Sequence, residues 1–313
     1  MRVLITGGAG CLGANLVEHL LARGDEISVI DTFTTSVREA LPPAGSRLRV
    51  VAGSVTDAAL VKAEVESFRP EAIIHAAASY KDPDDWAGDL EVNAAGTLNV
   101  VRAAEAAGGV RFLNLQTALC YGRPDVVPVA IDAPLRPFTS YGVSKVAGEL
   151  YVLASGLDAL SFRIANVTGP RLSIGPMPAF YSRLKAGKAC FCSDTVRDFL
   201  DMQDFIRLID LALVPGGPRG VFHASSGEGH SIREVYDGVS SYLGAEAPEP
   251  EVVPPGADDV AAVVLDPSGT EAAFGWKAEI SFGESLKRML AWYDVNGVHT
   301  VYGHVRPPAG YGS

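Results

Sequence analysis

The chain has 313 residues, of which 48% are hydrophobic and 20% charged, a composition that excludes disorder and coiled coil. Asp and Glu (37) outnumber Lys and Arg (26), and the net charge of −11 is a poor match for nucleic acid or an anionic membrane surface. No apolar stretch approaches the roughly 18 residues of a membrane span, and the first residues do not resemble a signal peptide. We expect a cytoplasmic protein with no nucleic-acid or membrane partner.

Short β-rich segments alternate with amphipathic helical segments along the first half of the chain. Strands are predicted at residues 2–7, 26–31, 47–53, 72–79, 111–117 and 160–166, and helices at residues 12–24, 55–68, 90–108 and 141–156. Strands that alternate with helices of this length form βαβ units. The predicted fold is therefore α/β, a Rossmann-type doubly wound parallel sheet with helices on both faces.

A glycine-rich turn lies between the first predicted strand and the first predicted helix. Thr6 is followed by the spacing Gly7-x-x-Gly10-x-x-Gly13. The first two glycines allow a tight turn against a pyrophosphate, and the third lets the helix pack closely on the strand. Asp31 closes the second strand about 20 residues further on, where a carboxylate binds ribose hydroxyls and repels a 2′-phosphate. The pattern predicts a dinucleotide site and favours NAD over NADP.

Tyr141 and Lys145 lie four residues apart in the helix predicted at residues 141–156, so their phenol and ammonium share one face. The ammonium is expected to lower the pKa of the phenol and to hold the nicotinamide ribose, while Tyr141 exchanges a proton with a substrate hydroxyl. Thr117 ends a predicted strand, at the carboxyl edge where parallel sheets bind ligands. Thr117, Tyr141 and Lys145 are the candidate catalytic residues.

Four motifs occur together along the chain: the glycine turn at residues 6–13, His-Ala-Ala-Ala at residues 75–78, Thr-x-x-x-Tyr-Gly at residues 117–122 and Tyr-Gly-Val-Ser-Lys at residues 141–145. Together they resemble the extended short-chain dehydrogenase/reductase family, and within it the NAD-dependent nucleotide-sugar epimerase/dehydratase branch, which includes UDP-sugar 4-epimerases. The resemblance extends to about residue 293. It implies tightly bound NAD, a nucleotide-sugar substrate and a homodimer.

The resemblance adds residues to the expected cofactor site. They are Cys11, Leu12, Thr35, Ser36, Ser54, Val55, Ala76, Ala77, Ala78 and Asn93. By the family pattern, the first two cover the pyrophosphate, the next two extend the ribose site begun at Asp31, and Ser54 and Val55 lie against adenine. The family usually has Asp at the position of Ser54. The alanines line the cofactor groove, although packing of a strand under a helix explains them equally well, and Asn93 steadies a loop around the active site.

Pro and Gly cluster after about residue 167, which indicates a smaller α/β lobe with long connections. We predict an NAD-binding Rossmann domain at residues 1–167. Residues 168–313 are predicted to form mainly a substrate-binding lobe, with segments that return to the Rossmann core.

The second half also contains two segments that resemble substrate-binding elements of the family. In the family pattern, Asn166 hydrogen-bonds the substrate diphosphate, and Arg197 of an Arg-Asp-Phe segment neutralises it. The chain departs from the pattern in two places. The loop before Arg197 is short, and Asp258 and Asp259 occur in a block that commonly supplies a second phosphate-binding Arg.

The residues after the catalytic Thr indicate the reaction. Dehydratases of the family carry Asp-Glu there, whereas this chain has Ala118 and Leu119, which transfer no proton. The 3,5-epimerases place a Cys at the position of Leu119, and Cys120 lies one residue beyond it. The prediction is 4-epimerisation through a transient 4-keto sugar, with Thr117 also contacting the substrate. The open alternatives are a dehydrogenase/reductase or dehydratase acting on a nucleotide sugar or related polyol, and a non-catalytic NAD-binding protein.

The four cysteines lack zinc-site spacing, so no metal and no disulfide are expected. The helices predicted at residues 90–108 and 141–156 resemble the pair that forms the interface of family homodimers. Their small apolar residues Ala94, Val100, Ala147 and Val152 are expected to pack there, although covering the sheet explains part of this pattern.

Overall fold

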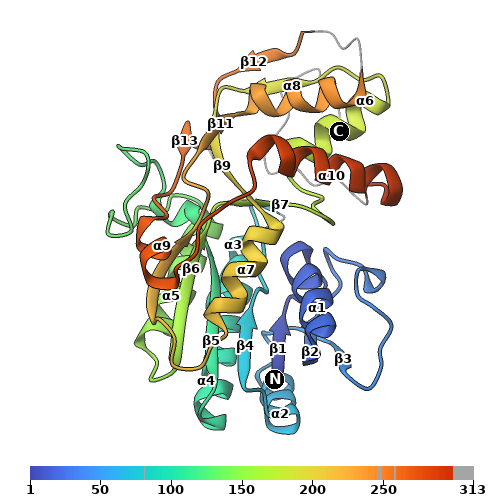
Figure 1. The fold of residues 1–313 in the computed structure, drawn as a ribbon. Helices are drawn as coiled ribbons and strands as arrows, with labels where there is room; N and C mark the ends of the chain where they lie inside the picture. The colour runs from blue at the N-terminus through green and yellow to red at the C-terminus, as the bar shows by residue number, and fades with distance from the viewer. Residues whose placement is uncertain (81, 245–248, 257–258, 299–313) are drawn as a thin grey trace.

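The structure is a computed structural model that describes residues 1–80, 82–244, 249–256 and 259–298. In the first half of the chain, strands and helices alternate in the predicted order (Figure 1). Its elements are β1 (Arg2–Thr6), α1 (Cys11–Arg23), β2 (Glu26–Asp31), η1 (Arg38–Ala40), β3 (Leu48–Ala52), α2 (Ala58–Phe68), β4 (Ala72–His75), α3 (Trp86–Asp89), the π-helical turn η2 (Leu90–Gly96), α4 (Thr97–Ala107), β5 (Arg111–Thr117), the 3₁₀ turn η3 (Ala118–Tyr121), α5 (Ser140–Ala154) and β6 (Asp158–Ile164).

Seven strands form one parallel sheet in the order β10-β6-β5-β4-β1-β2-β3, where β10 is Gly220–Ala224. The strand order reverses between β1 and β4, and ligands of such sheets bind beyond the carboxyl ends of the strands at this reversal. The Rossmann-type doubly wound parallel sheet predicted from the sequence is confirmed.

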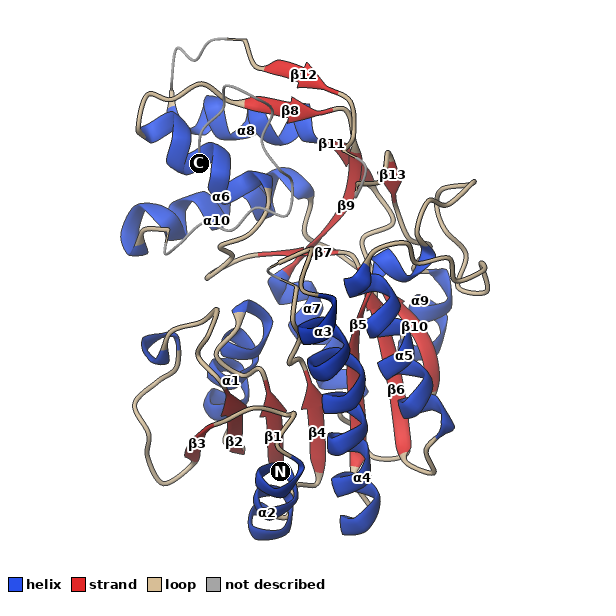
Figure 2. Ribbon diagram, turned by 180° about the vertical axis from the view of Figure 1, so that it is seen from behind, coloured by secondary structure: helices blue, strands red, loops and turns tan. Residues whose placement is uncertain are grey.

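The strands at the centre of the sheet are buried on both faces, as their continuous apolar sequences require. In β1, Val3 and Ile5 belong to a cluster that includes apolar residues of α1 and α7 (Met202–Ala212). Leu4, which points to the opposite face, belongs to a second cluster with residues of α2 and α4. The two faces of the sheet are thus covered by different helices (Figures 1 and 2).

The remaining elements lie mostly beyond the carboxyl ends of the sheet strands (Figure 2). They are β7 (Asn166–Thr168), α6 (Pro176–Lys185), β8 (Phe191–Ser193), β9 (Val196–Asp201), β11 (Gly229–Ser231), α8 (Ile232–Leu243), β12 (Glu251–Val253), β13 (Ala262–Val263), α9 (Ser268–Phe274) and α10 (Phe282–Asn296). Side chains of α6, α8 and α10 share a separate apolar cluster, which includes Phe180, Val235 and Leu286. Two segments of this half return to the large sheet: β10 pairs with β6, and α7 covers one face.

Two predicted elements differ from the structure. The single helix expected at residues 90–108 is a π-helical turn followed by α4, and the turn contains the buried Asn93. The strand expected at residues 160–166 ends at Ile164, and Asn166 instead begins β7, which pairs with β9 outside the large sheet. At both places a polar residue, Asn93 or Asn166, lies within an otherwise apolar segment. The apolar periodicity continues past it, so the sequence pattern predicts one longer element.

The expected dimer residues are placed differently. Ala94, Val100 and Val152 are buried inside the chain itself, and Ala147 is partly buried. Val100 and Val152 belong to the apolar cluster that covers one face of the sheet. Leu150 and Tyr151 of α5 are instead exposed.

Among the described residues, no helix combines the length and the apolar character needed to cross a membrane.

Candidate active site

Thr117 and Tyr141 meet where β5 ends and α5 begins. The hydroxyl of Thr139 caps α5 by accepting a hydrogen bond from the Gly142 amide at 3.1 Å, which places Tyr141 in the first turn. The Thr117 side chain lies close enough to the Tyr141 phenol to oppose the effect of burial on its pKa. The ring of Tyr80 lies edge-on to that of Tyr141, with 6.2 Å between the centroids. The two candidate catalytic hydroxyls are therefore adjacent.

Lys145 is buried one turn further along α5, and its ammonium donates a hydrogen bond to the Leu115 carbonyl at 2.7 Å. Burial lowers the pKa of Lys145 to about 8, while the nearby carboxylate of Glu149 acts in the opposite direction. Burial raises the pKa of Tyr141 above its ordinary value, an effect that Tyr80 increases and the Thr117 side chain opposes. The structure thus differs from the expected lowering of the phenol pKa, because desolvation outweighs the polar contacts.

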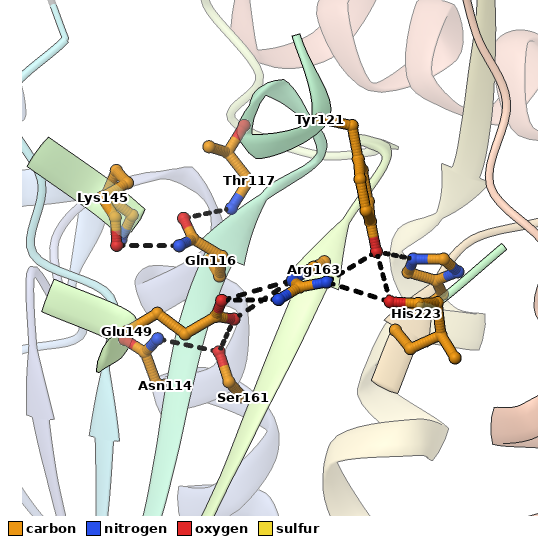
Figure 3. Close-up of polar contacts among 10 residues, drawn as sticks. Asn114, Gln116, Thr117, Tyr121, Lys145, Glu149, Ser161, Arg163 and His223 are labelled. Carbon is orange, nitrogen blue, oxygen red and sulfur yellow. Dashed lines mark hydrogen bonds and ion pairs between the residues drawn. The ribbon is translucent and has the colours of Figure 1, made fainter. Parts of the chain in front are cut away.

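Gln116 joins the backbones of two candidate catalytic residues, and sequence reasoning did not identify it. Its amide nitrogen donates to the Lys145 carbonyl at 2.7 Å, and its amide oxygen accepts from the Thr117 amide at 2.8 Å (Figure 3). The side chain is buried. A polar residue at a buried position of a predicted strand was the available signal, because such a group must have hydrogen-bond partners.

Asn93 links the loop after β4 to the catalytic helix. Its side-chain oxygen accepts from the Ser79 amide at 2.8 Å, and its nitrogen donates to the Ser79 carbonyl at 2.9 Å and to the Ser144 hydroxyl at 3.0 Å. In this position Asn93 holds a loop beside Tyr141, and its own side chain is buried.

The glycine turn packs tightly against the end of β4. Gly7 has a φ of 67°, and a Cβ there would lie 2.7 Å from the backbone nitrogen of Ala77. A Cβ at Gly13 would lie 2.4 Å from the Gly7 carbonyl oxygen. Gly10 precedes the first turn of α1, which has no side-chain cap. A helix N-terminus of this kind presents amide groups to an anion, so the turn fits a pyrophosphate.

Asp31 lies at the end of β2 and orders the loops around it. Its carboxylate accepts hydrogen bonds from the Ala9 amide at 2.9 Å, the Phe33 amide at 2.8 Å and the Ser36 hydroxyl at 3.0 Å. Thr35 is exposed next to Ser36. The buried carboxylate beside the glycine turn is placed as a ribose site requires.

The other expected cofactor residues surround the same edge of the sheet. Ala76, Ala77 and Ala78 are partly buried directly after β4. Ser54 and Val55 follow β3, where the Ser54 hydroxyl accepts from the Thr56 amide at 3.1 Å and Val55 is buried. Cys11 and Leu12 begin α1 and are partly buried. The Cys11 thiol faces the Pro170 carbonyl at 3.5 Å, and burial raises its pKa to about 12, an effect that Arg171 opposes.

Asn166 and Arg197 lie on the neighbouring parallel strands β7 and β9. Asn166 is exposed and donates to the Asp198 carbonyl at 3.1 Å. Arg197 forms an ion pair with Asp259 and also donates to the Val196 carbonyl at 2.8 Å. Burial lowers the pKa of Arg197, and Asp259 opposes this change. Asp258 lies outside the described residues.

The four cysteines are all free thiols. In the described part of the chain, no three His, Cys, Asp or Glu side chains are grouped in a way that could hold a metal ion.

A parallel sheet of this strand order, a glycine turn after the first strand and adjacent Thr, Tyr and Lys side chains define a dinucleotide-binding protein of the short-chain dehydrogenase/reductase type. The family described as "NAD dependent epimerase/dehydratase family" matches residues 3–223. The chain belongs to this family.

The alignments with similar proteins cover nearly the whole chain. The Bordetella bronchiseptica enzyme WbmG, solved in complex with NAD and UDP, is 59% identical with a TM-score of 0.93, and the match covers 98% of this chain and 99% of WbmG. WbmH from the same organism, solved with NAD+, is 42% identical with a TM-score of 0.90, over 95% of this chain and 99% of WbmH. A UDP-glucose 4-epimerase of Mycolicibacterium smegmatis is 31% identical over 94% of this chain and 98% of its own length.

Proposed function

We propose that this protein is an NAD-dependent nucleotide-sugar 4-epimerase. The observation that carries the proposal is the adjacent pair of Thr117 and Tyr141 hydroxyls beside the buried Lys145, followed by Ala118 and Leu119, which have no acid or base. The relatives named UDP-glucose 4-epimerase support the same reaction.

The catalytic residues have separate tasks. In its phenolate form Tyr141 takes the proton of the sugar 4-hydroxyl as the 4-keto sugar forms, and it returns a proton when the hydroxyl is restored. The positive charges of Lys145 and of bound NAD would stabilise this phenolate against the burial that raises its pKa. Thr117, whose side chain lies near the Tyr141 phenol, orients the same sugar oxygen. Lys145 is the buried cation of the site and holds the nicotinamide ribose. NAD, when bound, supplies the hydride acceptor and donor for sugar C4.

The cofactor and the substrate occupy different parts of the chain in this proposal. Residues 1–167 bind NAD, with the glycine turn on the pyrophosphate and Asp31 on the adenosine ribose. Residues 168–313 contribute mainly to the substrate, although β10 and α7 belong structurally to the large sheet. Asn166 and Arg197 contact the diphosphate of the nucleotide sugar, and the complex of WbmG with UDP is consistent with such a ligand.

The dehydratase alternative requires an acid and a base that the segment after Thr117 lacks. Ala118 and Leu119 carry no ionisable group, and Cys120 is fully buried. Burial raises the pKa of the Cys120 thiol to about 12, so it remains protonated at neutral pH.

A substrate deuterated at sugar C4 tests the reaction. We expect the 4-epimer to form with the deuterium still at C4, because the hydrogen removed from this carbon returns to it without exchange with water. Mass spectrometry and NMR of the product measure the label. Loss of deuterium to solvent, or build-up of NADH with a ketone product, contradicts the epimerase and supports a dehydrogenase. A product lighter by one water supports a dehydratase.

We also propose that two copies associate through α5 and the neighbouring helices. Leu150 and Tyr151 are 55% and 45% exposed, and Leu90 of the adjoining π-helical turn is 60% exposed, so these helices present apolar side chains to solvent. The proposed dimer surface therefore consists of these larger exposed residues and not of the small residues expected from the sequence.

Sedimentation at micromolar concentration is expected to give the mass of two chains for the wild type and of one chain for Leu150→Asp, because a carboxylate in an apolar interface lacks a partner. Leu211→Asp, at an exposed position of α7, is the matched control and remains dimeric. A wild-type mass of one chain contradicts the dimer.

A further inference from the structure

A group of buried polar side chains extends from the catalytic helix into the protein (Figure 3). Glu149 lies one helical turn after Lys145 on α5, and its side chain is fully buried. Ser161 and Arg163 lie two residues apart on β6 and reach the Glu149 carboxylate from the same face of the strand. The Ser161 hydroxyl donates to one oxygen at 2.7 Å, and Arg163 donates to the other at 2.8 Å.

These contacts keep Glu149 and Arg163 as an ion pair. Burial by itself acts to lower the pKa of Arg163, but the hydrogen bonds and charge of Glu149 raise it above the ordinary value overall. The side-chain amide of Asn114 donates to the Ser161 hydroxyl at 2.9 Å and so orients this donor. The carboxylate therefore has a hydrogen-bond partner for each oxygen, as a buried polar group requires.

The far side of Arg163 is also held. Its guanidinium donates to the Tyr121 hydroxyl at 2.8 Å, and this hydroxyl lies 2.6 Å from His223 Nε2. His223 Nδ1 lies 2.8 Å from the Asp266 carbonyl, which only accepts, so Nδ1 carries the hydrogen. Burial lowers the pKa of His223 to about 4, so the ring is neutral and its Nε2 accepts a hydrogen bond from the Tyr121 hydroxyl. Arg163 is thus fixed between β10 and α5.

The negative charge of Glu149 favours the protonated form of Lys145. Burial lowers the pKa of Lys145, and Glu149 is the anion that opposes this change. On β4, His75 is fully buried with a pKa of about 3, so it is neutral near Lys145. Tyr141 on α5 is also neutral at neutral pH, since burial raises its pKa. The charge of Arg163 on β6 is paired with Glu149. Asp89 on α3, which packs against α5, is buried, and burial raises its pKa.

We propose that Glu149 is a positioning residue of the active site, whose buried carboxylate, fixed by Arg163 and Ser161, keeps the Lys145 side chain in its ammonium form at neutral pH. This inference rests on the proposed function and deepens it. Without the carboxylate, Lys145 becomes a neutral amine at lower pH and the site loses its cation.

The test is the pH dependence of Glu149→Gln. Wild-type kcat is expected to fall as the pH rises through about 8, where Lys145 loses its proton. In Glu149→Gln this alkaline limb is expected at a pH lower by about one to two units, the effect of removing an anion one helical turn away at an effective dielectric near 20. Glu149→Asp, whose carboxylate lies one methylene farther back, is expected between the two.

Glu64→Gln is the matched control. Glu64 is also buried, on α2, and accepts from the Ser28 hydroxyl at 2.7 Å and from Arg49 at 3.1 Å. Its helix packs against α4 and β1. Glu64→Gln also removes a buried negative charge. The alkaline limb of its kcat–pH profile is expected to match that of the wild type. Equal shifts in Glu64→Gln and Glu149→Gln overturn the inference, because they indicate general destabilisation.

A second readout is independent of the reaction. Protein labelled with ¹³C at lysine Cε is titrated by NMR without substrate, and the Lys145 signal is assigned with Lys145→Met. An unchanged Lys145 titration in Glu149→Gln overturns the inference even when the wild type epimerises. A wild type that does not epimerise overturns the proposed function alone. If Glu149→Gln does not fold, Glu149→Asp decides the question by the same titration, since an unshifted Lys145 signal counts against the inference.

Discussion

Replacing Tyr141 by Phe is expected to lower kcat by about 10²–10⁴-fold, the usual contribution of a general acid or base. The ring still packs against Tyr80, but the hydroxyl that exchanges a proton with the sugar oxygen is gone. Thr117→Val is expected to lower kcat less, because it removes an orienting hydrogen bond and leaves the proton acceptor in place. Initial rates with a nucleotide-sugar substrate measure both effects.

Two controls separate the chemistry from folding and cofactor binding. NAD that remains bound to Tyr141→Phe, measured after denaturation of the purified protein, shows that the site is intact. Tyr242→Phe removes a hydroxyl that donates to Asp294, between α8 and α10, and this variant is expected to retain wild-type kcat. A Tyr141→Phe variant with nearly full activity assigns the proton exchange to another group.

Arg163→Met is expected to lower the free energy of unfolding by about 3–5 kcal/mol, since it leaves the Glu149 carboxylate buried without its charged partner. Urea unfolding at fixed protein and NAD concentrations measures this change. The exposed pair of Arg102 and Glu105 provides the control, and Arg102→Met is expected to lower the free energy by less than about 1 kcal/mol.

The double variant Glu149→Leu/Arg163→Met tests the cause of this destabilisation. Two apolar side chains leave no unpaired charge inside the protein, so most of the lost stability is expected to return. A double variant less stable than Arg163→Met contradicts the explanation and places the stabilisation in the hydrogen bonds of Ser161 and Tyr121.

The fold could be predicted from the sequence because its information is local. Apolar strands alternate with amphipathic helices, and Gly7, Gly10 and Gly13 mark the first crossover. The Tyr141 and Lys145 pair was visible for the same reason, since four residues along a helix correspond to one turn.

The polar network was not predicted because its members come from separate elements. Glu149 on α5 meets Arg163 on β6 and, through it, Tyr121 and His223. Periodicity reports which side chains are buried but not which buried groups meet across strands. Charged and polar residues within apolar strand patterns were the only trace of these contacts.

Three of the four residues expected at a dimer interface are buried within the chain for a related reason. Small apolar residues suit a helix–helix interface and a helix–sheet interface equally, and in this chain Ala94 and Val100 pack inward. Close approach within the chain also uses small residues, since a Cβ at Gly148 of α5 would lie 2.4 Å from the Asn93 carbonyl oxygen.

In the proposed substrate site, the ion pair of Arg197 with Asp259 would make diphosphate binding an exchange of counter-ions. Arg197 is already neutralised by its own chain before a diphosphate arrives, so the ligand gains only the difference between two ion pairs. Added salt competes weakly with a pair that is mostly buried, and simple anions such as inorganic phosphate gain little by displacing Asp259. A site of this kind would favour ligands whose sugar and base make further contacts over the small anions that an unpaired arginine attracts.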